Sequence, residues 1–407
     1  MVLIFLAFRF SAFSAKRAFP FSGERAIFSI RKTSCFAAMP PAPTKILNTT
    51  DGRFWSSLDI EPAELSLKFT LTTGQTFRWR STAPNEWTGV LGKYVVRLRQ
   101  SSDDKLHYQT FPCLAKNHVQ SQSFITSFND YFNLSTPLQP LYNHFSLSDK
   151  RFALISPYFP GARMLRQDPL ECLISFICSS NNNIKRITSM IEYLCQNYGD
   201  LIAEVDGQSY YAFPTLDQLL TVKPDKLLSE GGFGYRSKWI LAAAKRIDKL
   251  GGVEWLQTLR TCSREESHAE LIKLDGIGDK VASCVALFSL DKHDELPVDT
   301  HVWQIVLRDY PELVIKGKSL TKTVYKQIGT FFRDRFGPYA GWAHNILFIA
   351  DLTDHRSLLP PHLQNSSPSA SQKKSKKRSK KQHFSGDEDE DEDDYEEERP
   401  RIGRRSI

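Results

Sequence analysis

The feature that most constrains this chain is a change in the spacing of its apolar residues near residue 121. Before that point, short runs alternate apolar and polar side chains, as half-buried strands do. After it, apolar residues recur three or four positions apart, which is typical of amphipathic helices. An antiparallel sheet followed by many helices is an α+β fold. The expected strands are LSLKFTL (65–71), TFRWR (76–80), EWTGVL (86–91), YVVRLRQ (94–100) and KLHYQTF (105–111).

The two ends of the chain differ in composition from its middle. Residues 1–39 are rich in Phe, Ser, Ala and Arg, which is typical of a mitochondrial transit segment. The competing interpretations are a disordered tail and an upstream extension with translation starting at Met39. The block KKSKKRSKK (373–381) fits a nuclear import signal or a solvated low-complexity tail. We therefore expect nuclear localisation, with the mitochondrion as a second destination. The predicted segments are a transit or disordered segment (1–45), a sheet domain (46–150), a helical domain (151–358) and a disordered tail (359–407).

The net charge of +7 does not by itself indicate a nucleic-acid partner. The tail from residue 371 balances 11 basic side chains against 11 acidic ones, and residues 1–39 carry six basic residues and one acid, so only about +2 remains for the middle. Any DNA-binding face must then come from local arrangement. Seven cysteines without a CxxC pair predict reduced thiols and no zinc or iron–sulfur site. No apolar run is long enough to cross a bilayer, so we expect no membrane partner.

The segment LDGIGDKVASC (274–284) places two glycines, Gly276 and Gly278, between two helical patterns. Such a turn suits a hairpin whose glycines need positive φ. Its N–H groups point outward at a helix N-terminus, where a phosphate can bind without side-chain charge. A plain interhelical turn is the alternative. Lys280 lies in the first turn of the new helix, where the dipole disfavours an ammonium ion, and a neutral amine is a nucleophile that can form a Schiff base. The alternative for Lys280 is an ordinary surface lysine.

A second polar group follows in ELPVDTHVW (295–303). Pro297 interrupts the preceding pattern, so Asp299 is expected at the N-cap of the next helix. A carboxylate there can stabilise a cationic sugar or accept a proton, although a simple helix cap is the alternative. His301, two residues further on, either binds a phosphate or is an ordinary partly buried histidine.

The string LDGIGDKVASCVALFSLDK…LPVDTHVWQIVLRDY resembles the helix-hairpin-helix and Gly/Pro-Asp region of the base-excision DNA glycosylase superfamily, and within it the eukaryotic 8-oxoguanine DNA glycosylases. The resemblance spans roughly residues 50 to 355. It includes TGQTFRW (73–79), LRQDPLECLISFICSSNNNIKRI (165–187), GFGYRSKW (232–239) and GPYAGWAHNILFIADL (337–352).

The resemblance implies a bifunctional DNA glycosylase and AP lyase. The position of Lys280 matches the lysine that attacks C1′ of the sugar and leaves an imine, and Asp299 matches the aspartate that stabilises the charge. The imine permits β-elimination of the 3′ phosphate. The resemblance implies no metal or organic cofactor, and its partner is duplex DNA with 8-oxoguanine opposite cytosine. We also expect a monomer.

The resemblance also places a recognition site for the extruded base. The base is expected between Cys284 and Phe348, with the Gly74 carbonyl accepting the N7 hydrogen that only the oxidised base carries. His344 stands where the best-known members have a glutamine, which leaves the reading of the Watson–Crick edge open. The residues that the resemblance matches to the opposite strand are Asn181, Arg186, Tyr235 and Arg236. Gly276, Gly278 and His301 remain the residues expected, from the hairpin and the helix start, to bind the DNA backbone.

Two other functions stay open on sequence grounds. One is a superfamily glycosylase that acts on another lesion, although those relatives usually carry four cysteines around an iron–sulfur cluster. The other is a non-catalytic helix-hairpin-helix module that binds damaged DNA. The joint presence of Lys280 and Asp299 favours an enzyme.

Overall fold

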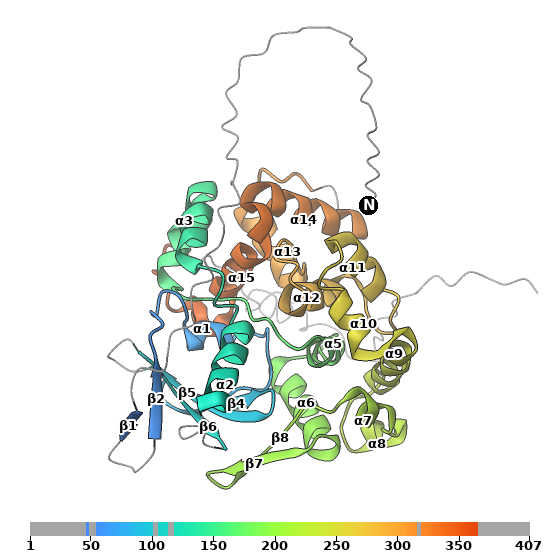
Figure 1. Cartoon of the computed structure of the whole chain (residues 1–407). Helices are drawn as coiled ribbons and strands as arrows, with labels where there is room; N and C mark the ends of the chain where they lie inside the picture. Colours follow the sequence, from blue (N-terminus) through green and yellow to red (C-terminus); the bar gives the residue numbers. More distant parts are fainter. Residues whose placement is uncertain (1–45, 49–53, 101–104, 113–117, 316–318, 365–407) are drawn as a thin grey trace, which may run out of the picture. The chain divides into compact units, whose positions relative to one another are not determined.

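The predicted β-like region forms one antiparallel sheet in the computed structural model (Figure 1), which describes residues 46–48, 54–100, 105–112, 118–315 and 319–364. The strand order is β1-β2-β6-β5-β4-β3. Neighbouring strands pair antiparallel, with Trp87 opposite Leu98 and Arg99 opposite His107. The strands are β1 (Ile46–Asn48), β2 (Phe54–Leu58), β3 (Arg80–Ala83), β4 (Glu86–Leu91), β5 (Tyr94–Gln100) and β6 (Leu106–Phe111).

Two of the expected strands are wrong. The run LSLKFTL contains helix α1 (Leu67–Leu71), which Ser66 caps by accepting a hydrogen bond from the amide of Phe69. The alternating residues Leu67, Phe69 and Leu71 are all buried, as predicted for one face of a strand. A run this short fits a helix equally well, so the alternation did not distinguish the two structures. Only the last residue of TFRWR belongs to a strand, because this segment leaves the sheet to reach the helices.

Helix α2 (His118–Tyr131) packs against the sheet and extends the predicted sheet domain beyond strands alone. Phe124, Phe128 and Phe132 recur every four residues and are fully buried. Their rings contact Tyr108 of β6 and Trp79, so a continuous aromatic layer joins the helix to the sheet. A further helix, α3 (Leu138–Ser148), also lies within the predicted sheet domain.

The rest of the described chain is mostly helical, as predicted. Helix α5 is at its centre: every residue except Glu171 is buried, and it packs against α6, α9, α10 and α12. The helices are α4 (Lys150–Ile155), α5 (Pro169–Cys178), α6 (Ile184–Tyr198), α7 (Leu216–Leu220), α8 (Pro224–Ser229), α9 (Arg236–Leu250), α10 (Gly252–Thr258), α11 (Arg264–Leu271), α12 (Asp279–Ser289), α13 (Thr300–Asp309), α14 (Lys322–Phe336), α15 (Ala340–Asp351) and α16 (Thr353–Arg356), with single 3₁₀ turns at Ser156–Tyr158 and Gly337–Tyr339.

One hairpin within the helical region was not expected. Strands β7 (Leu201–Val205) and β8 (Gln208–Tyr211) pair antiparallel around Asp206 and Gly207, both at positive φ. An Asp-Gly pair is the usual signal for such a two-residue turn. The signal was present in the sequence but was obscured by the helical patterns on either side.

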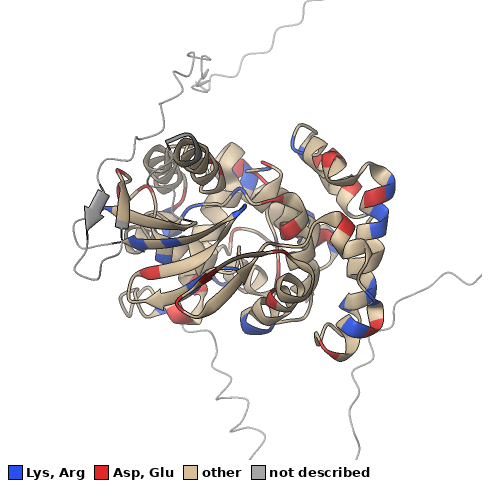
Figure 2. Ribbon diagram, turned by 60° about the horizontal axis from the view of Figure 1, so that its bottom comes forward, with Lys and Arg blue, Asp and Glu red and all other residues tan. Residues whose placement is uncertain are grey.

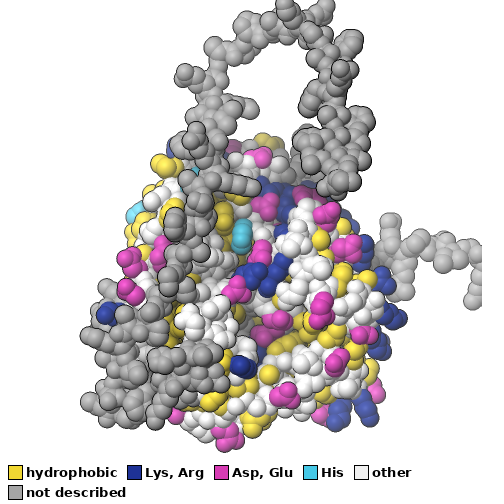
Figure 3. Space-filling view, viewed as in Figure 1, with side chains coloured by type: hydrophobic (Ala, Val, Ile, Leu, Met, Phe, Trp, Pro, Cys, Tyr) yellow, Lys and Arg dark blue, Asp and Glu magenta, His cyan; other side chains and the backbone are white. Residues whose placement is uncertain are grey.

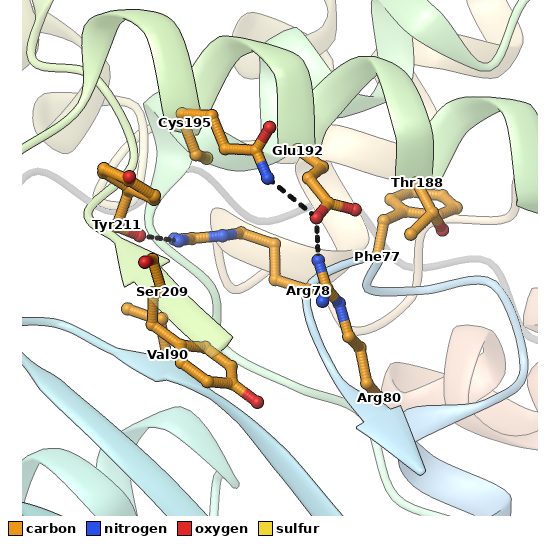
Figure 4. A pocket seen from close by; sticks show the side chains of 11 residues that line it. Phe77, Arg78, Arg80, Val90, Thr188, Glu192, Cys195, Ser209 and Tyr211 are labelled. Carbon is orange, nitrogen blue, oxygen red and sulfur yellow. Dashed lines mark hydrogen bonds and ion pairs between the residues drawn. The ribbon is translucent and has the colours of Figure 1, made fainter. Parts of the chain in front are cut away.

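The TFRWR segment is fixed to the helical region by its arginines (Figure 4). Arg78 donates to the carbonyl oxygen of Tyr211 in β8 and, at 3.1 Å, to Glu171 in α5. Because the anchor lies four residues after Gly74, it limits where the Gly74 loop can lie relative to the helices.

Charges of both signs are interleaved over the described surface. Figures 2 and 3 show Lys and Arg beside Asp and Glu on many elements, with no broad basic field on the face in view. This agrees with the expectation that DNA contacts come from local geometry. Among the described residues no helix has the length and apolar character needed to cross a membrane, and no cluster of His, Cys, Asp and Glu could hold a metal ion. The predicted transit segment (1–45) falls outside the described residues, and β1 begins just after it. The predicted start of the tail at residue 359 is wrong, because Leu359 and Leu363 are buried in the helical core and Arg151 donates to the Leu363 carbonyl; residues 365–407 lie outside the described residues.

Candidate active site

The hairpin between α11 and α12 is shaped by its first glycine. Gly276 has φ +77°, and a Cβ there would lie 2.6 Å from Cβ of Trp239, so both conformation and space require glycine. The expectation of positive φ at Gly278 is wrong, since φ is −97°. No described atom lies within 4 Å of a Cβ built at Gly278. The intramolecular packing therefore explains Gly276 but not Gly278.

Lys280 lies in the first turn of α12, as predicted. Gly278 is the N-cap and offers no side-chain oxygen, so the first amides of α12 have no side-chain cap. The ammonium nitrogen Nζ of Lys280 lies 3.5 Å from Oγ of Ser179 and 5.2 Å from the centre of the Phe176 ring. The aromatic ring and the helix start together hold the amine at the wall of a pocket.

Asp299 caps α13, which confirms the predicted local structure. The amides of His301 and Val302 both donate to Oδ1, each at 2.9 Å. Because a single oxygen serves the cap, Oδ2 is not needed to hold the helix.

One pocket brings together six residues that the sequence singled out. Its wall contains Lys280 and Asp299 together with Gly74, Cys284, His344 and Phe348. The cavity is about 60 Å³, and it shares Gly74, Lys280, Asp299 and Phe348 with a wider groove of about 1090 Å³. These residues come from α12, α13, α15 and the Gly74 loop, so only the folded chain joins them.

Two ionisable side chains in the pocket wall, Cys284 and His344, are kept uncharged by burial. Burial raises the pKa of the Cys284 thiol to about 11, although the charge of Lys280 opposes this. Burial also lowers the pKa of His344 to about 4, against the attraction of Asp299. Nε2 of His344 has no hydrogen-bond partner among the described residues. A neutral imidazole with a buried nitrogen unpartnered by the described residues therefore lines the pocket, where a ligand has a hydrogen-bonding group to pair with it.

The Gly74 loop is held from below by Gln75. Gln75 Nε2 donates to the carbonyls of Thr70 and Arg163 at 2.9 Å, and its Oε1 accepts from the amide of Leu165 at 3.0 Å. Gly74 has φ +85°, while a Cβ there would only touch Ile184 at 3.5 Å. Glycine is thus required by the turn itself, and the neighbouring glutamine fixes the direction of the loop.

The residues matched to the opposite strand form one cluster beside this pocket. Arg236 is buried, and its guanidinium donates to the carbonyls of Ser180 and Asn181. Tyr235 is 48% exposed and its ring lies 4.5 Å from the Arg236 guanidinium. Arg186 donates to the Gly232 carbonyl at 2.9 Å. In this structure Arg236 shapes the Asn181 turn, whereas Tyr235 is open to solvent.

The groove also contains residues that the sequence did not single out. Phe176 contacts Lys280 and stacks on Phe288, while Ser179 lies within 3.5 Å of the amine. Both lie at the end of α5, whose uniformly apolar sequence indicates only a buried core helix.

His301, which the sequence did single out, also lines the groove, with its ring 6.2 Å from the Phe348 ring.

Comparison with known families assigns both halves of the chain. The model of the "HhH-GPD superfamily base excision DNA repair protein" matches residues 174–381, and that of the "8-oxoguanine DNA glycosylase, N-terminal domain" matches residues 57–173. A hairpin, a first-turn lysine and a capping aspartate around one pocket are consistent with these matches. Fold and site thus define a helix-hairpin-helix DNA glycosylase.

Individual relatives narrow this class. The chain is 39% identical to N-glycosylase/DNA lyase OGG1 of Arabidopsis thaliana over 84% of this chain and 93% of the relative, and 36% identical to the N-glycosylase/DNA lyase of Saccharomyces cerevisiae over 73% and 86%. It resembles the structure of Clostridium acetobutylicum 8-oxoguanine glycosylase/lyase with double-stranded DNA containing cytosine opposite 8-oxoguanine (TM-score 0.60, 30% identity, 75% and 97% covered). The chain belongs to the 8-oxoguanine DNA glycosylase family.

Proposed function

We propose that this chain is a bifunctional DNA glycosylase and AP lyase that removes 8-oxoguanine opposite cytosine from duplex DNA. The observation that carries this proposal is the meeting of Lys280, Asp299 and the Gly74 loop in one pocket that opens into a groove. Release of free 8-oxoguanine and cleavage of the strand at that position test it.

Lys280 acts as the nucleophile. After Nζ has given up a proton, the amine attacks C1′, the N-glycosidic bond breaks, and the base departs with the bonding electrons and takes up a proton. The C1′–O4′ bond then breaks, O4′ takes up the proton that the bound amine releases, and C1′ is left in an imine with Nζ. Loss of a C2′ proton from this imine expels the 3′ phosphate by β-elimination. Asp299 stabilises the positive charge that develops on the sugar. Its Oδ2 is suited to this because Oδ1 already serves the helix cap.

The extruded base occupies the pocket between Cys284 and Phe348. A protonated thiol and an aromatic ring offer a flat, uncharged slot. The Gly74 carbonyl accepts the N7 hydrogen of the oxidised base, and the loop that carries it is fixed by Gln75. His344 contributes one donor and one acceptor near the Watson–Crick edge.

Replacing His344 with glutamine should change the pH dependence of stability without loss of turnover. The folded-state pKa of His344 lies below its usual 6.5, so the unfolded chain binds the proton first as the pH falls. The wild type should therefore lose up to about 3 kcal/mol of unfolding free energy between about pH 6.5 and pH 4, and the variant should lack this contribution. Urea unfolding at pH 7 and pH 4.5, with single-turnover assays, measures both. Identical pH dependence would contradict the buried neutral state, and complete loss of excision would show a separate role for His344.

The hairpin binds a DNA phosphate through its backbone. The first amides of α12 lack a side-chain cap, and Gly278 leaves space in front of them.

The opposite DNA strand is contacted by Arg186, Asn181 and Tyr235. Tyr235 fills the position of the extruded base, and the polar groups of Arg186 and Asn181 read cytosine. Arg236 contributes to the recognition of cytosine in one of two ways. Its guanidinium leaves the carbonyls of Ser180 and Asn181 and contacts the base, or it stays in place and supports the Asn181 turn.

Alanine at the two hairpin glycines should separate folding from DNA binding. Gly276→Ala forces a contact with Trp239 at positive φ, so we expect a loss of about 1–3 kcal/mol in stability. Gly278→Ala meets no described atom, so stability should change by less than about 0.5 kcal/mol while DNA affinity falls several-fold. Thermal unfolding and fluorescence anisotropy measure the two effects. Unchanged affinity in Gly278→Ala would contradict a phosphate at this position.

The quaternary state and localisation complete the proposal. We propose a monomer, because one chain supplies every residue of the pocket. The basic block 373–381 and residues 1–39 support the nucleus and the mitochondrion as destinations, and both lie outside the described residues.

A further inference from the structure

The starts of α12 and α13 are joined by a tyrosine from a third helix. Tyr325 lies in α14, which contributes no described residue to the wall of the pocket. Its ring is half-buried and packs against the core, and its hydroxyl points between the two helix starts. The contacts of this hydroxyl have no part in the chemistry described above.

The hydroxyl of Tyr325 lies within hydrogen-bond distance of α12 and of the segment that leads into α13. It lies 2.7 Å from Oγ of Ser283 and 3.4 Å from the carbonyl of Asp279, both in α12. It lies 3.0 Å from the carbonyl of Leu296 and accepts from the amide of Val298 at 3.3 Å, both just before α13. Asp279 is the neighbour of Lys280, and Val298 is the neighbour of Asp299.

A buried carboxylate completes the bridge. Ser283 is fully buried and donates to Oε1 of Glu295 at 2.7 Å. Glu295 lies in the same connecting segment as Val298 and is itself buried. On α11, Arg264 and His268 lie 3.7 and 3.9 Å from this carboxylate. The bridge therefore reaches the other helix of the hairpin, and each of its polar groups has a partner.

We propose that Tyr325 is a positioning residue that sets the distance between Lys280 and Asp299, because its hydroxyl donates to Ser283 of α12 and accepts from the amide of Val298 before α13. This inference rests on the proposed roles of that lysine and aspartate. Burial raises the pKa of the tyrosine, so its hydroxyl keeps its proton and remains a donor at neutral pH. Nucleophile and charge stabiliser sit on separate helices, and a small relative shift of these helices is enough to slow the reaction.

Tyr325→Phe tests the inference because it removes only the hydroxyl. We expect the single-turnover rate of 8-oxoguanine excision at saturating enzyme to fall about 10- to 100-fold, while the dissociation constant for the same DNA stays within about twofold. A rate constant measured under saturation does not depend on the folded fraction, so a purely structural role would leave it unchanged. Tyr142→Phe is the matched control. The buried hydroxyl of Tyr142 donates to the Phe159 carbonyl with a length of 2.7 Å, and this hydrogen bond lies outside the pocket.

The outcomes separate the inference from the function on which it rests. Absence of excision by the wild type would overturn the proposed function. Excision by the wild type with equal rates in Tyr325→Phe and Tyr142→Phe would overturn the positioning role alone. Should Tyr325→Phe fail to fold, Ser283→Ala decides: a rate loss of about fivefold or more supports the bridge, and an unchanged rate contradicts it.

Discussion

Lys280→Gln is expected to lower the rate of base excision by at least about 10³-fold. The reason is chemical, since glutamine has no amine that could attack C1′ or form an imine. The fold should survive, because the ammonium group contributes a long hydrogen bond to Ser179, the face of Phe176 and an interaction with the Cys284 thiol. Single-turnover assays on duplex DNA with 8-oxoguanine opposite cytosine measure the loss.

A second lysine provides the control for this variant. Lys273 precedes the hairpin, is exposed and pairs with Glu270 outside the pocket. Lys273→Gln should excise the base at nearly the wild-type rate, and both variants should bind the DNA. Full excision activity in Lys280→Gln would remove this lysine from the mechanism.

Asp299→Asn is expected to lower excision about 10²- to 10³-fold with little change in stability. Asparagine is a good N-cap, so it can still accept from the amides of His301 and Val302, but it brings no charge to the developing cation. Asp299→Ala loses the cap as well, and we expect it to destabilise the protein by about 1 kcal/mol in addition.

Comparing the two variants distinguishes the charge from the cap. Thermal unfolding and single-turnover rates should show that asparagine restores stability but not activity. Restoration of both would mean that Asp299 serves only as a helix cap, which is the simpler interpretation of its position in the sequence.

Local structure was predictable wherever a short segment determines it. The cap at Asp299 follows from the proline two residues before it, and Asn183 caps α6 by accepting from the Arg186 amide at 3.0 Å. Helix α1 was not predictable in this way, because its five residues are buried except for Lys68, and so short a run fits either period. The β7–β8 hairpin carried an Asp-Gly turn signal, but such a signal predicts a hairpin only when clear strand patterns flank it, and here helical patterns lie on both sides.

The pocket depends on contacts between distant parts of the chain. Gly74, Lys280 and His344 are brought together by packing, and the Gly74 loop is oriented by Gln75 reaching Arg163. The spacing of apolar residues along a sequence does not reveal contacts between distant segments. Only the resemblance to a known family grouped these residues before the structure did. The Tyr325 bridge shows the same limit: a tyrosine in a helical pattern reads as core, and its hydroxyl partners come from α12 and from the segment before α13.

Borohydride reduction during incubation with duplex DNA carrying 8-oxoguanine opposite cytosine tests the central claim most directly. The reductant converts an imine between Nζ of Lys280 and the sugar into a stable amine, which joins protein and DNA covalently. We predict a trapped adduct with the wild type, none with Lys280→Gln, and less trapping when the duplex carries an oxidised pyrimidine instead. A wild-type protein that excises the base without a trapped adduct would contradict the lysine nucleophile, and preferred trapping on the oxidised pyrimidine would contradict the proposed substrate.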